Sequence, residues 1–471
     1  MKMLVAGRWL DKAEQSEVRN PFDATLVDTV PRADAADVEA ALAAAVEGAA
    51  IMRRLTGYER YKILNRASQI MRERVEHLAR LISLEEGKIL AESRMEATRA
   101  AEIIEYSAEE AKRITGEVLP LDGAANGAGK FGFTLRVPCG VVVAITPFNF
   151  PLHLPCHKVG PALAAGNSII LKPAGNTPLS SLALAEILLE AGLPPLAISC
   201  ITGSGAAIGD QLCSDPRVRK ISFTGSRDVG EHICRVAGIK RVTMELGSNA
   251  PLIVMDDADL DQAAAAAVAT GFSNAGQVCI SAQRVIAIDR VYGNLLDALQ
   301  PKVAAFTAGN QLEPSTKMGP MIREADAVRV GEWINEAVGG GAKVLAGGKR
   351  NGTLHEATLV ADVSPDMRIS CEELFGPAIA VTRADSIEQA IAMANDTRYG
   401  LSAAIFTRDI GRALKFAKEV DSGNLHINWG PQWRADLMPY GGLKDSGLGK
   451  EGPKYAILEM TELKTVVVHG V

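Results

Sequence analysis

Short apolar runs alternate with helical stretches through most of the chain. Val141–Ile145 and Ser168–Leu171 are rich in β-branched side chains, as strands buried on both faces are. A helix is expected to follow Thr177, its N-cap, and to end near Ala191, before Gly192. Further strands are predicted at Ala197–Ile201, Lys220–Phe223 and Arg241–Met244. This alternation indicates an α/β fold with a parallel, doubly wound sheet, which binds ligands at the carboxyl ends of its strands.

A second block with the same alternation runs from Pro251 to His426 and predicts a separate α/β domain. Its expected elements are strands at Leu252–Met255, Arg284–Ile288 and Ala403–Phe406 and an alanine-rich helix that begins at Asp259. Before the first block, Asp34–Arg113 is charged and helical and should pack on the first domain. Gly116–Pro138 and Leu463–His469 fit neither block and are predicted to be projecting strands, as in an intersubunit sheet.

The composition is that of a globular protein. The chain has 471 residues, 47% hydrophobic and 23% charged, which is enough for two to four domains. A net charge of −6 without any basic run argues against nucleic-acid binding. No apolar run reaches the ~20 residues of a membrane helix and no signal peptide is recognised, so a cytoplasmic protein without membrane contact is expected. Seven cysteines without a close-spaced pair indicate reduced thiols.

Three residues carry groups that act in acyl-enzyme chemistry. Cys279 lies in a small, polar loop, where a thiol is more accessible than inside an aliphatic run. Glu245 ends one predicted strand, and Asn149 follows another. Each alone suits a structural role: a buried thiol, a capping carboxylate or a turn amide. Together they supply a nucleophile, a general base and an oxyanion donor.

Two other motifs carry weaker signals. Gly203, Gly205 and Gly209 follow an apolar run like a dinucleotide fingerprint, but the last glycine is one position late. A tight strand-to-helix turn is therefore favoured. His153 and His157 have the spacing of a helical metal site, but Pro155 lies between them, so no metal is expected there.

Seven motifs occur in an order that resembles the aldehyde dehydrogenase superfamily: PFNFP, ILKPA, FTGS, MELGSNAP, GQVC, EELFGP and MPYGGLKDSGLGKEG. The resemblance extends from about Val5 to the C-terminus. It implies oxidation of an aldehyde to the free carboxylic acid with reduction of NAD or NADP. The last motif is similar to branches that act on lactaldehyde, glyceraldehyde 3-phosphate, phosphonoacetaldehyde and semialdehydes, which implies a small oxygenated or anionic substrate.

The resemblance also implies three structural parts. Residues 1–115 and 139–246 correspond to a cofactor-binding domain, 247–445 to a catalytic domain, and 116–138 with 446–471 to a small β oligomerisation element. Both domains are expected to be doubly wound parallel sheets. The implied assembly is a homodimer or a homotetramer.

The catalytic roles follow by resemblance. The Cys279 thiolate attacks the aldehyde carbon, while the Asn149 amide and the Cys279 backbone N–H stabilise the oxyanion. Glu245 then activates the water that hydrolyses the thioester. CoA-acylating relatives lack this glutamate, so its presence favours hydrolysis, with transfer to CoA as the alternative. A catalytically silent, structural relative is a further alternative, and such a protein would be expected to lose Cys279 or Glu245.

The resemblance assigns a cofactor site as well. Lys172 corresponds to the lysine that holds the adenosine ribose, and Gly225 with Ser226 would meet the pyrophosphate at a helix start. Glu373 and Phe375 would hold the nicotinamide ribose. Other cofactor contacts are implied for Ile145, Thr146, Pro147, Phe148, Val229 and Leu246.

Gly175 departs from the pattern of NAD-preferring relatives, which often carry a glutamate at this position. That glutamate binds the ribose hydroxyls and repels a 2′-phosphate, so its absence implies that NADP is accepted. Alternatively, Gly175 only shapes the turn and leaves a preference for NAD.

The substrate end is assigned to the segment from His426 to Tyr440 and to His153. Arg434 and His153 are candidates to bind an anionic tail, with arginine favoured for its planar fork of donors. The alternative for Arg434 is a structural pair with Asp436 or with an acid at an interface. Tyr440 is expected at the substrate tunnel.

Overall fold

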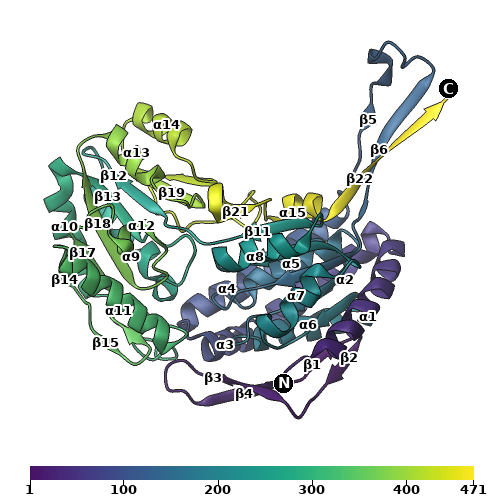
Figure 1. Ribbon diagram of the computed structural model, residues 1–471, viewed down its shortest axis with the longest axis horizontal. Coiled ribbons are helices and arrows are strands. Elements are labelled where there is room, and N and C mark those ends of the chain that lie inside the picture. The colour runs from purple at the N-terminus through teal and green to yellow at the C-terminus, as the bar shows by residue number, and fades with distance from the viewer. Residues whose placement is uncertain (471) are drawn as a thin grey trace.

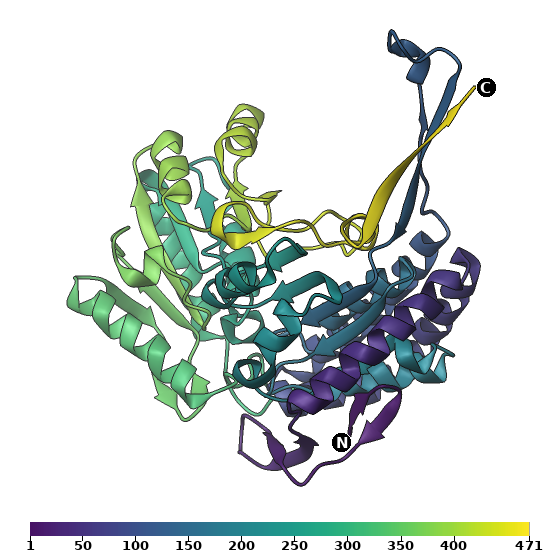
Figure 2. The same cartoon turned by 45° about the vertical axis from the view of Figure 1, so that its right-hand side comes forward.

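The computed structural model describes residues 1–470 and has two bodies built on sheets, with a long arm projecting from one of them (Figures 1 and 2). The first sheet has eight strands in the order β2–β1–β9–β8–β7–β10–β11–β21. They are β1 (Met3–Val5), β2 (Arg8–Leu10), β7 (Val141–Ile145), β8 (Ser168–Lys172), β9 (Ile198–Cys200), β10 (Val218–Thr224), β11 (Arg241–Glu245) and β21 (Gly447–Leu448). The five central strands, β7 to β11, are parallel.

Helices cover both faces of the first sheet. They are α1 (Ala35–Arg54), α2 (Gly57–Glu73), α3 (Val75–Glu86), α4 (Leu90–Ala111), α5 (His153–Ala164), α6 (Leu179–Glu190), α7 (Gly205–Ser214) and α8 (Arg227–Ala237). Strand β7 shows how the sheet is buried. Val142 and Ala144 pack into one core with α2 to α6, whereas Val141, Val143 and Ile145 pack into a second core with α1, α7 and α8.

The second sheet has seven strands in the order β14–β17–β18–β13–β12–β19–β20. They are β12 (Pro251–Val254), β13 (Arg284–Ile288), β14 (Lys343–Ala346), β17 (Thr358–Ala361), β18 (Ala378–Ala384), β19 (Ser402–Phe406) and β20 (Asn424–Ile427). All neighbours except β14 and β17 pair in parallel. Its principal helices are α9 (Leu260–Phe272), α10 (Asp289–Ala304), α11 (Glu324–Gly339), α12 (Arg368–Cys371), α13 (Ile387–Asn395) and α14 (Ile410–Glu419).

The arm is a three-stranded antiparallel sheet of β5 (Val118–Leu119), β6 (Lys130–Pro138) and β22 (Thr461–His469). Strand β22 pairs with β6 along its whole length, and its other edge is free in the described chain. It follows the short helix α15 (Pro453–Glu459). The expected fold, two doubly wound parallel sheets with a small β element, is therefore confirmed. Within residues 1–470, no helix has both the length and the apolar character needed to cross a membrane.

One predicted helix start is wrong in detail. Helix α6 begins at Leu179 with Pro178 at its N-cap, so Thr177 does not cap it. The Thr177 hydroxyl instead donates to the Phe148 carbonyl. The carboxylate of Glu85, at the end of α3, accepts the N–H groups of Leu179 and Ser180 at 2.7 and 2.9 Å. A remote side chain thus satisfies the donors that a local cap was expected to satisfy. The helix predicted to begin at Asp259 begins one residue later, at Leu260, and Asp259 is its N-cap.

Candidate active site

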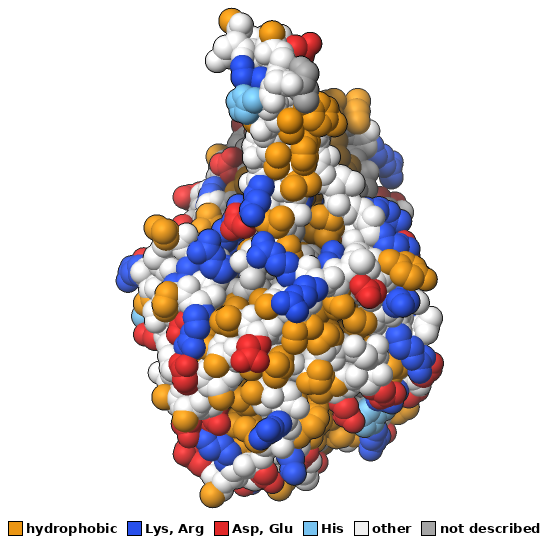
Figure 3. All heavy atoms as spheres, turned by 90° about the vertical axis from the view of Figure 1, so that its right-hand side faces the viewer, with side chains coloured by type: hydrophobic (Ala, Val, Ile, Leu, Met, Phe, Trp, Pro, Cys, Tyr) orange, Lys and Arg blue, Asp and Glu red, His pale blue; other side chains and the backbone are white. Residues whose placement is uncertain are grey.

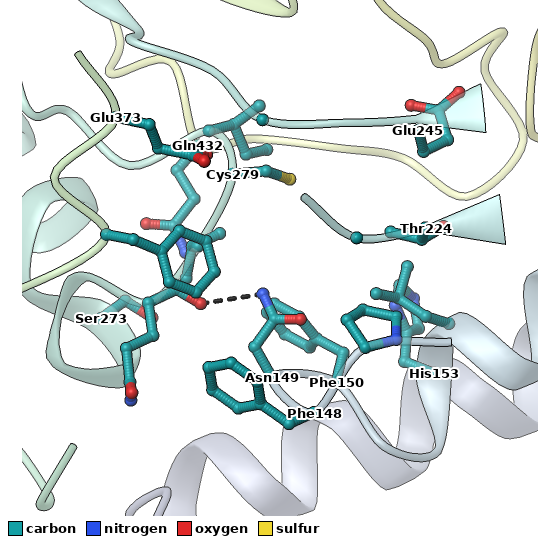
Figure 4. A pocket seen from close by; sticks show the side chains of 18 of the residues that line it. Phe148, Asn149, Phe150, His153, Thr224, Glu245, Ser273, Cys279, Glu373 and Gln432 are labelled. Carbon is teal, nitrogen blue, oxygen red and sulfur yellow. Dashed lines mark hydrogen bonds between the residues drawn. The ribbon is translucent and has the colours of Figure 1, made fainter. Parts of the chain in front are cut away.

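A cavity of about 1040 Å³ lies where the two bodies meet. The first sheet contributes Thr224 and Glu245 at the carboxyl ends of β10 and β11, together with the Pro147–Phe150 loop after β7. The second body contributes Cys279 and Glu373, and Figure 4 shows these side chains facing one another. Strands β7 and β10 are neighbours from which the chain continues in opposite directions, so the cavity opens at the switch point of a doubly wound sheet.

Cys279 is presented by a backbone turn that follows α9. Asn274, Ala275 and Gly276 have φ values of 51°, 54° and 69°, a left-handed run. The first two residues carry a side chain in this region, which costs about 1–2 kcal/mol each. A Cβ at Gly276 would lie 2.1 Å from the Gly376 carbonyl oxygen, so only glycine fits there. This strained turn marks a constrained position directly before the thiol.

Two carboxylates, the buried Glu86 and the half-buried Glu92, hold the turn. The Asn274 backbone N–H donates to both oxygens of Glu92 at 3.2 and 3.3 Å, and its side-chain amide donates to Glu86 at 2.9 Å. Burial raises the pKa of Glu86 to about 8. The Asn274 amide also donates to the Asn149 carbonyl at 3.3 Å, so the turn is bonded directly to the candidate oxyanion residue.

The Cys279 sulfur lies 3.5 Å from the Tyr440 hydroxyl. Burial raises the pKa of the Cys279 thiol to about 12, and the contact with Tyr440 opposes this rise. At neutral pH the resting group is therefore a protonated thiol. A reaction has to generate the thiolate in place.

Asn149 is fixed at both its side chain and its backbone. Its Nδ2 donates to the Gln277 carbonyl at 2.8 Å, the dashed contact in Figure 4, which places the amide beside the Cys279 loop. Its own carbonyl accepts a hydrogen bond of 2.8 Å from Lys88, whose ammonium also pairs with Glu96. Lys88 is fully buried, and no sequence signal singled it out.

Glu245 points into the cavity from the end of β11. Both of its carboxylate oxygens are buried and have no hydrogen-bond partner within residues 1–470. Burial, and secondly the nearby Glu451 carboxylate, raises the pKa of Glu245 well above its ordinary value. A carboxyl group in such a setting accepts a proton readily once it is ionised, which suits a general base.

Glu451 lies at the centre of a buried ionic group that sequence reasoning missed. It accepts hydrogen bonds from Lys158 at 3.0 Å and from Arg434 at 3.1 Å. Although burial acts in the opposite direction, these two cations hold the pKa of Glu451 well below its ordinary value. Glu451 belongs to the quoted motif MPYGGLKDSGLGKEG, so the motif contained the signal.

Arg434 forms internal contacts, as the alternative of a structural ion pair predicts, although its main partners are not the expected Asp436. Its partners are Glu451 and the Nδ1 atom of His157, at 3.0 Å, while Asp436 lies farther, at 3.9 Å from Nε. That Nε is buried and has no hydrogen-bond partner in the described chain. The guanidinium also stacks on the Tyr440 ring, 4.0 Å from its centroid.

Asp436 ties the loop of Arg434 to two helices. Its carboxylate accepts hydrogen bonds from Arg99 of α4 at 2.7 Å and from Nε2 of His153 and His157 of α5 at 3.1 and 3.2 Å. Nδ1 of His157 accepts from Arg434, so its Nε2 carries the proton given to Asp436. His153, proposed to bind an anionic tail, is thus engaged internally.

The reason given against a helical histidine pair was wrong. Pro155 lies in the first turn of α5, where proline is tolerated, so His153 and His157 do share one helix face. Burial, and secondly Arg434, lowers the pKa of His157 to about 3. Both histidines serve as neutral donors to Asp436.

The expected cofactor residues occupy the carboxyl edge of the first sheet. Ile145 and Lys172 end β7 and β8. Lys172 is buried with no acidic partner within residues 1–470, and burial lowers its pKa to about 8. Its ammonium donates only to the Pro173 carbonyl among the described residues. Beyond it, Gly175 is exposed, with open space around its Cα.

A helix start lies at the same edge. Ser226 precedes α8, and its side chain caps none of the first N–H groups, which stay available to an anion. A Cβ at Gly225 would lie 2.5 Å from the Phe223 ring, so only glycine fits in this turn and its backbone N–H groups are not covered by a side chain. Val229 is exposed on α8, and Leu246 lines the cavity.

The second body supplies the facing wall. Glu373 accepts a hydrogen bond of 2.8 Å from the Ser248 N–H, and burial raises its pKa to about 7. Phe375 has a left-handed φ of 50° and meets the Phe148 ring edge-on at 6.0 Å.

The hydroxyl of Thr146 is buried without a partner in the described chain, and Pro147 lines the cavity. An orphaned hydroxyl, an unpaired lysine and a free helix start fit a polar, anionic cofactor.

Comparisons with known proteins identify the family. The model of the aldehyde dehydrogenase family matches residues 9–466. The chain is 45% identical to a 3-sulfolactaldehyde dehydrogenase of Priestia aryabhattai, covering 99% of this chain and 98% of that protein. It is 41% identical to an NADP(+) succinate-semialdehyde dehydrogenase of Escherichia coli K12, covering 99% and 97%.

A solved structure extends the likeness to three dimensions. The glyceraldehyde-3-phosphate dehydrogenase GapN of Methanocaldococcus jannaschii, complexed with NADP, superposes with a TM-score of 0.94 at 36% identity. The match covers 97% of this chain and all of that one. With seven motifs in order, a family model over nearly the whole chain and this shared fold, the chain belongs to the aldehyde dehydrogenase family.

Proposed function

We propose that this aldehyde dehydrogenase oxidises a small anionic aldehyde to its free acid with NAD or NADP. The observation that carries the anionic substrate is Arg434, a buried guanidinium at the cavity with an unpartnered Nε among the described residues. Relatives named for sulfonated and carboxylated aldehydes support the same reading.

The charge balance around Arg434 favours an anion. Three cations, Arg99, Arg434 and Lys158, face two strongly acidic carboxylates, Asp436 and Glu451. Within this group of five side chains, one positive charge is left over. A substrate carboxylate, sulfonate or phosphate would neutralise it in a region shielded from water.

The reaction would use the three residues named from the sequence. The Cys279 sulfur attacks the aldehyde carbon, and the developing oxyanion receives hydrogen bonds from Asn149 Nδ2 and the Cys279 N–H. Bound NAD(P) supplies the acceptor for the hydride that leaves this carbon, which leaves a thioester on Cys279. Ionised Glu245 then takes a proton from the water that attacks the thioester. Lys172, Ser226 and Glu373 would hold the cofactor.

The substrate class is tested with pairs of aldehydes of similar size that differ in charge. Succinate semialdehyde, phosphonoacetaldehyde and glyceraldehyde 3-phosphate are compared with lactaldehyde and propanal, with and without CoA. We expect NAD(P)H formation without CoA and higher kcat/KM for the anionic members. In Arg434→Met, kcat/KM for these members should fall about ten- to hundredfold, because a hydrogen bond to a charge is lost.

The neutral aldehydes are the internal control for that variant. Their kcat/KM should fall far less, whereas an equal fall for both classes would mean that Arg434 only supports the fold. A strict requirement for CoA would contradict hydrolysis. Preference of the unchanged enzyme for neutral aldehydes would overturn the anionic substrate.

We also infer that NADP is accepted, because Lys172 has no acidic partner and Gly175 carries no side chain. Gly175→Glu adds a carboxylate where the structure has open space, so the fold should tolerate it. The added charge would repel a 2′-phosphate, and we expect the ratio of kcat/KM for NADP to that for NAD to fall at least about tenfold. Gly175→Gln is the control of matched size. An unchanged ratio in the glutamate variant would refute this account of cofactor choice.

The arm is proposed to join copies of this chain into a dimer or tetramer. Apolar side chains gather along it and at its base in Figure 3, among them the exposed Val118, Phe131, Leu135, Leu463, Val467 and Val468. A free strand edge beside them is an aggregation hazard unless a partner covers it. Light scattering that gave a monomer would contradict this assembly.

A further inference from the structure

We propose that Tyr440 is a further catalytic residue, whose hydroxyl donates a hydrogen bond to the Cys279 thiolate when it forms and when the thioester expels it. The inference rests on the proposed function, since it takes Cys279 as the nucleophile. The hydroxyl oxygen lies 3.5 Å from the Cys279 sulfur, within hydrogen-bond range for sulfur. That sulfur is its one hydrogen-bond partner in the part of the chain that the structure describes.

The backbone and the ring of Tyr440 are both held in place. Its N–H and carbonyl exchange hydrogen bonds of 3.1 and 2.7 Å with Glu451, which anchors the segment to the buried ionic group. The ring packs with Val278 and Ile280, the residues on either side of the nucleophile. The Arg434 guanidinium stacks on this ring. Only 4% of Tyr440 is exposed, so packing fixes the ring and with it the position of the hydroxyl.

The polarity of the contact changes during the reaction. With a neutral thiol, either the sulfur or the oxygen can donate. With a thiolate, only the tyrosine carries a proton in this contact. Burial, and secondly Cys279, raises the pKa of Tyr440 well above its ordinary value, so the phenol keeps that proton. The Arg434 cation on the ring face strengthens the O–H as a donor, because it stabilises negative charge on the oxygen.

The same bond acts at both ends of the cycle. When the thiol passes its proton to water, the tyrosine O–H stabilises the charge on sulfur and increases the fraction of thiolate. When water adds to the thioester, a carbon–oxygen bond forms, the carbon–sulfur bond breaks, and the electron pair returns to sulfur. The tyrosine stabilises this leaving group, and its own proton stays on oxygen throughout.

Tyr440→Phe removes the hydroxyl and keeps the ring beneath Arg434. The test measures the rate at which iodoacetamide alkylates Cys279 in the full-length enzyme between pH 7 and 10, with peptide mass spectrometry identifying each cysteine. We expect the rate at Cys279 to fall about ten- to hundredfold at each pH, as for loss of a hydrogen bond to a charged group. Cys234 and Cys371 are half-buried elsewhere, and their alkylation rates should not change.

Tyr292→Phe is the matched control. Tyr292 is also a buried tyrosine with an arginine, Arg383, over its ring at 3.7 Å, but its hydroxyl bonds to Asp362 away from the cavity. An unchanged or faster alkylation of Cys279 in Tyr440→Phe would overturn the assignment. The proposed function would fail in a different way. If Cys279 is not the nucleophile, complete alkylation of Cys279 in the unchanged enzyme leaves aldehyde oxidation intact.

Discussion

Replacement of Cys279 by alanine should lower aldehyde oxidation by about 10⁴-fold or more, because among the described residues no other cysteine lines the cavity to form the covalent intermediate. Binding of NAD(P) should survive. The sulfur belongs to the second body, whereas Lys172 and Ser226 lie at the edge of the first sheet. The measurement pairs initial rates of NAD(P)H formation with a fluorescence titration of the cofactor.

Cys234→Ala is the control for this variant. Cys234 is half-buried on α8 and does not line the cavity, so its loss should leave turnover close to that of the unchanged enzyme. Turnover by Cys279→Ala within tenfold of normal would remove the covalent mechanism. If Cys279→Ala lost both turnover and cofactor binding, the cause would be collapse of the strained turn at Asn274–Gly276 and not the missing thiol.

Glu245→Gln should separate the two halves of the reaction. The glutamine keeps the size of the side chain but cannot accept a proton, so hydrolysis of the thioester should slow by about 10²–10⁴-fold. Formation of the thioester needs no activated water. Stopped-flow absorbance should therefore show a first turnover of NAD(P)H per active subunit, followed by a slow steady state.

An added thiol provides the discriminating control for Glu245→Gln. A thiol attacks a thioester with less help than water, so 2-mercaptoethanol should speed the steady state of this variant. It should do nothing for Cys279→Ala, which forms no thioester. A steady-state rate equal to that of the unchanged enzyme would exclude Glu245 as the base.

The sequence pattern predicted most of the architecture, because strands buried on both faces leave a continuous apolar signal. Val141–Ile145 and Arg284–Ile288 are such strands, and the structure has them with the predicted bounds. The candidate base and oxyanion donor were predicted because Glu245 ends and Asn149 follows a strand of this kind, and the candidate nucleophile was predicted from the polar loop that holds it. In the structure, Cys279, Glu245 and Asn149 line one cavity.

The contacts that hold the site were not predictable in this way. Lys88 lies in the short connection between α3 and α4, and Lys158 lies in the mostly apolar helix α5, yet a lysine is by type a solvent-exposed residue. Both are buried, because their carboxylate partners Glu96 and Glu451 come from other elements of the fold. The left-handed conformation of Ala275 has no signal in its residue type either. Such features depend on pairs of residues that only the folded chain brings together.

The irregular segment after β20 carries Arg434, whereas Glu245 lies at a strand end. This arrangement separates residues that can differ between relatives with different substrates from residues that the shared reaction requires. The proposed base lies at a strand end that the cores fix, while the proposed contact with the tail of the substrate comes from a loop, the kind of segment that varies most between relatives. Descendants of one ancestral enzyme can thus exchange one acid tail for another without rebuilding their catalytic centre. Two relatives fit this expectation. They are 41% and 45% identical to this chain and are named for different aldehydes.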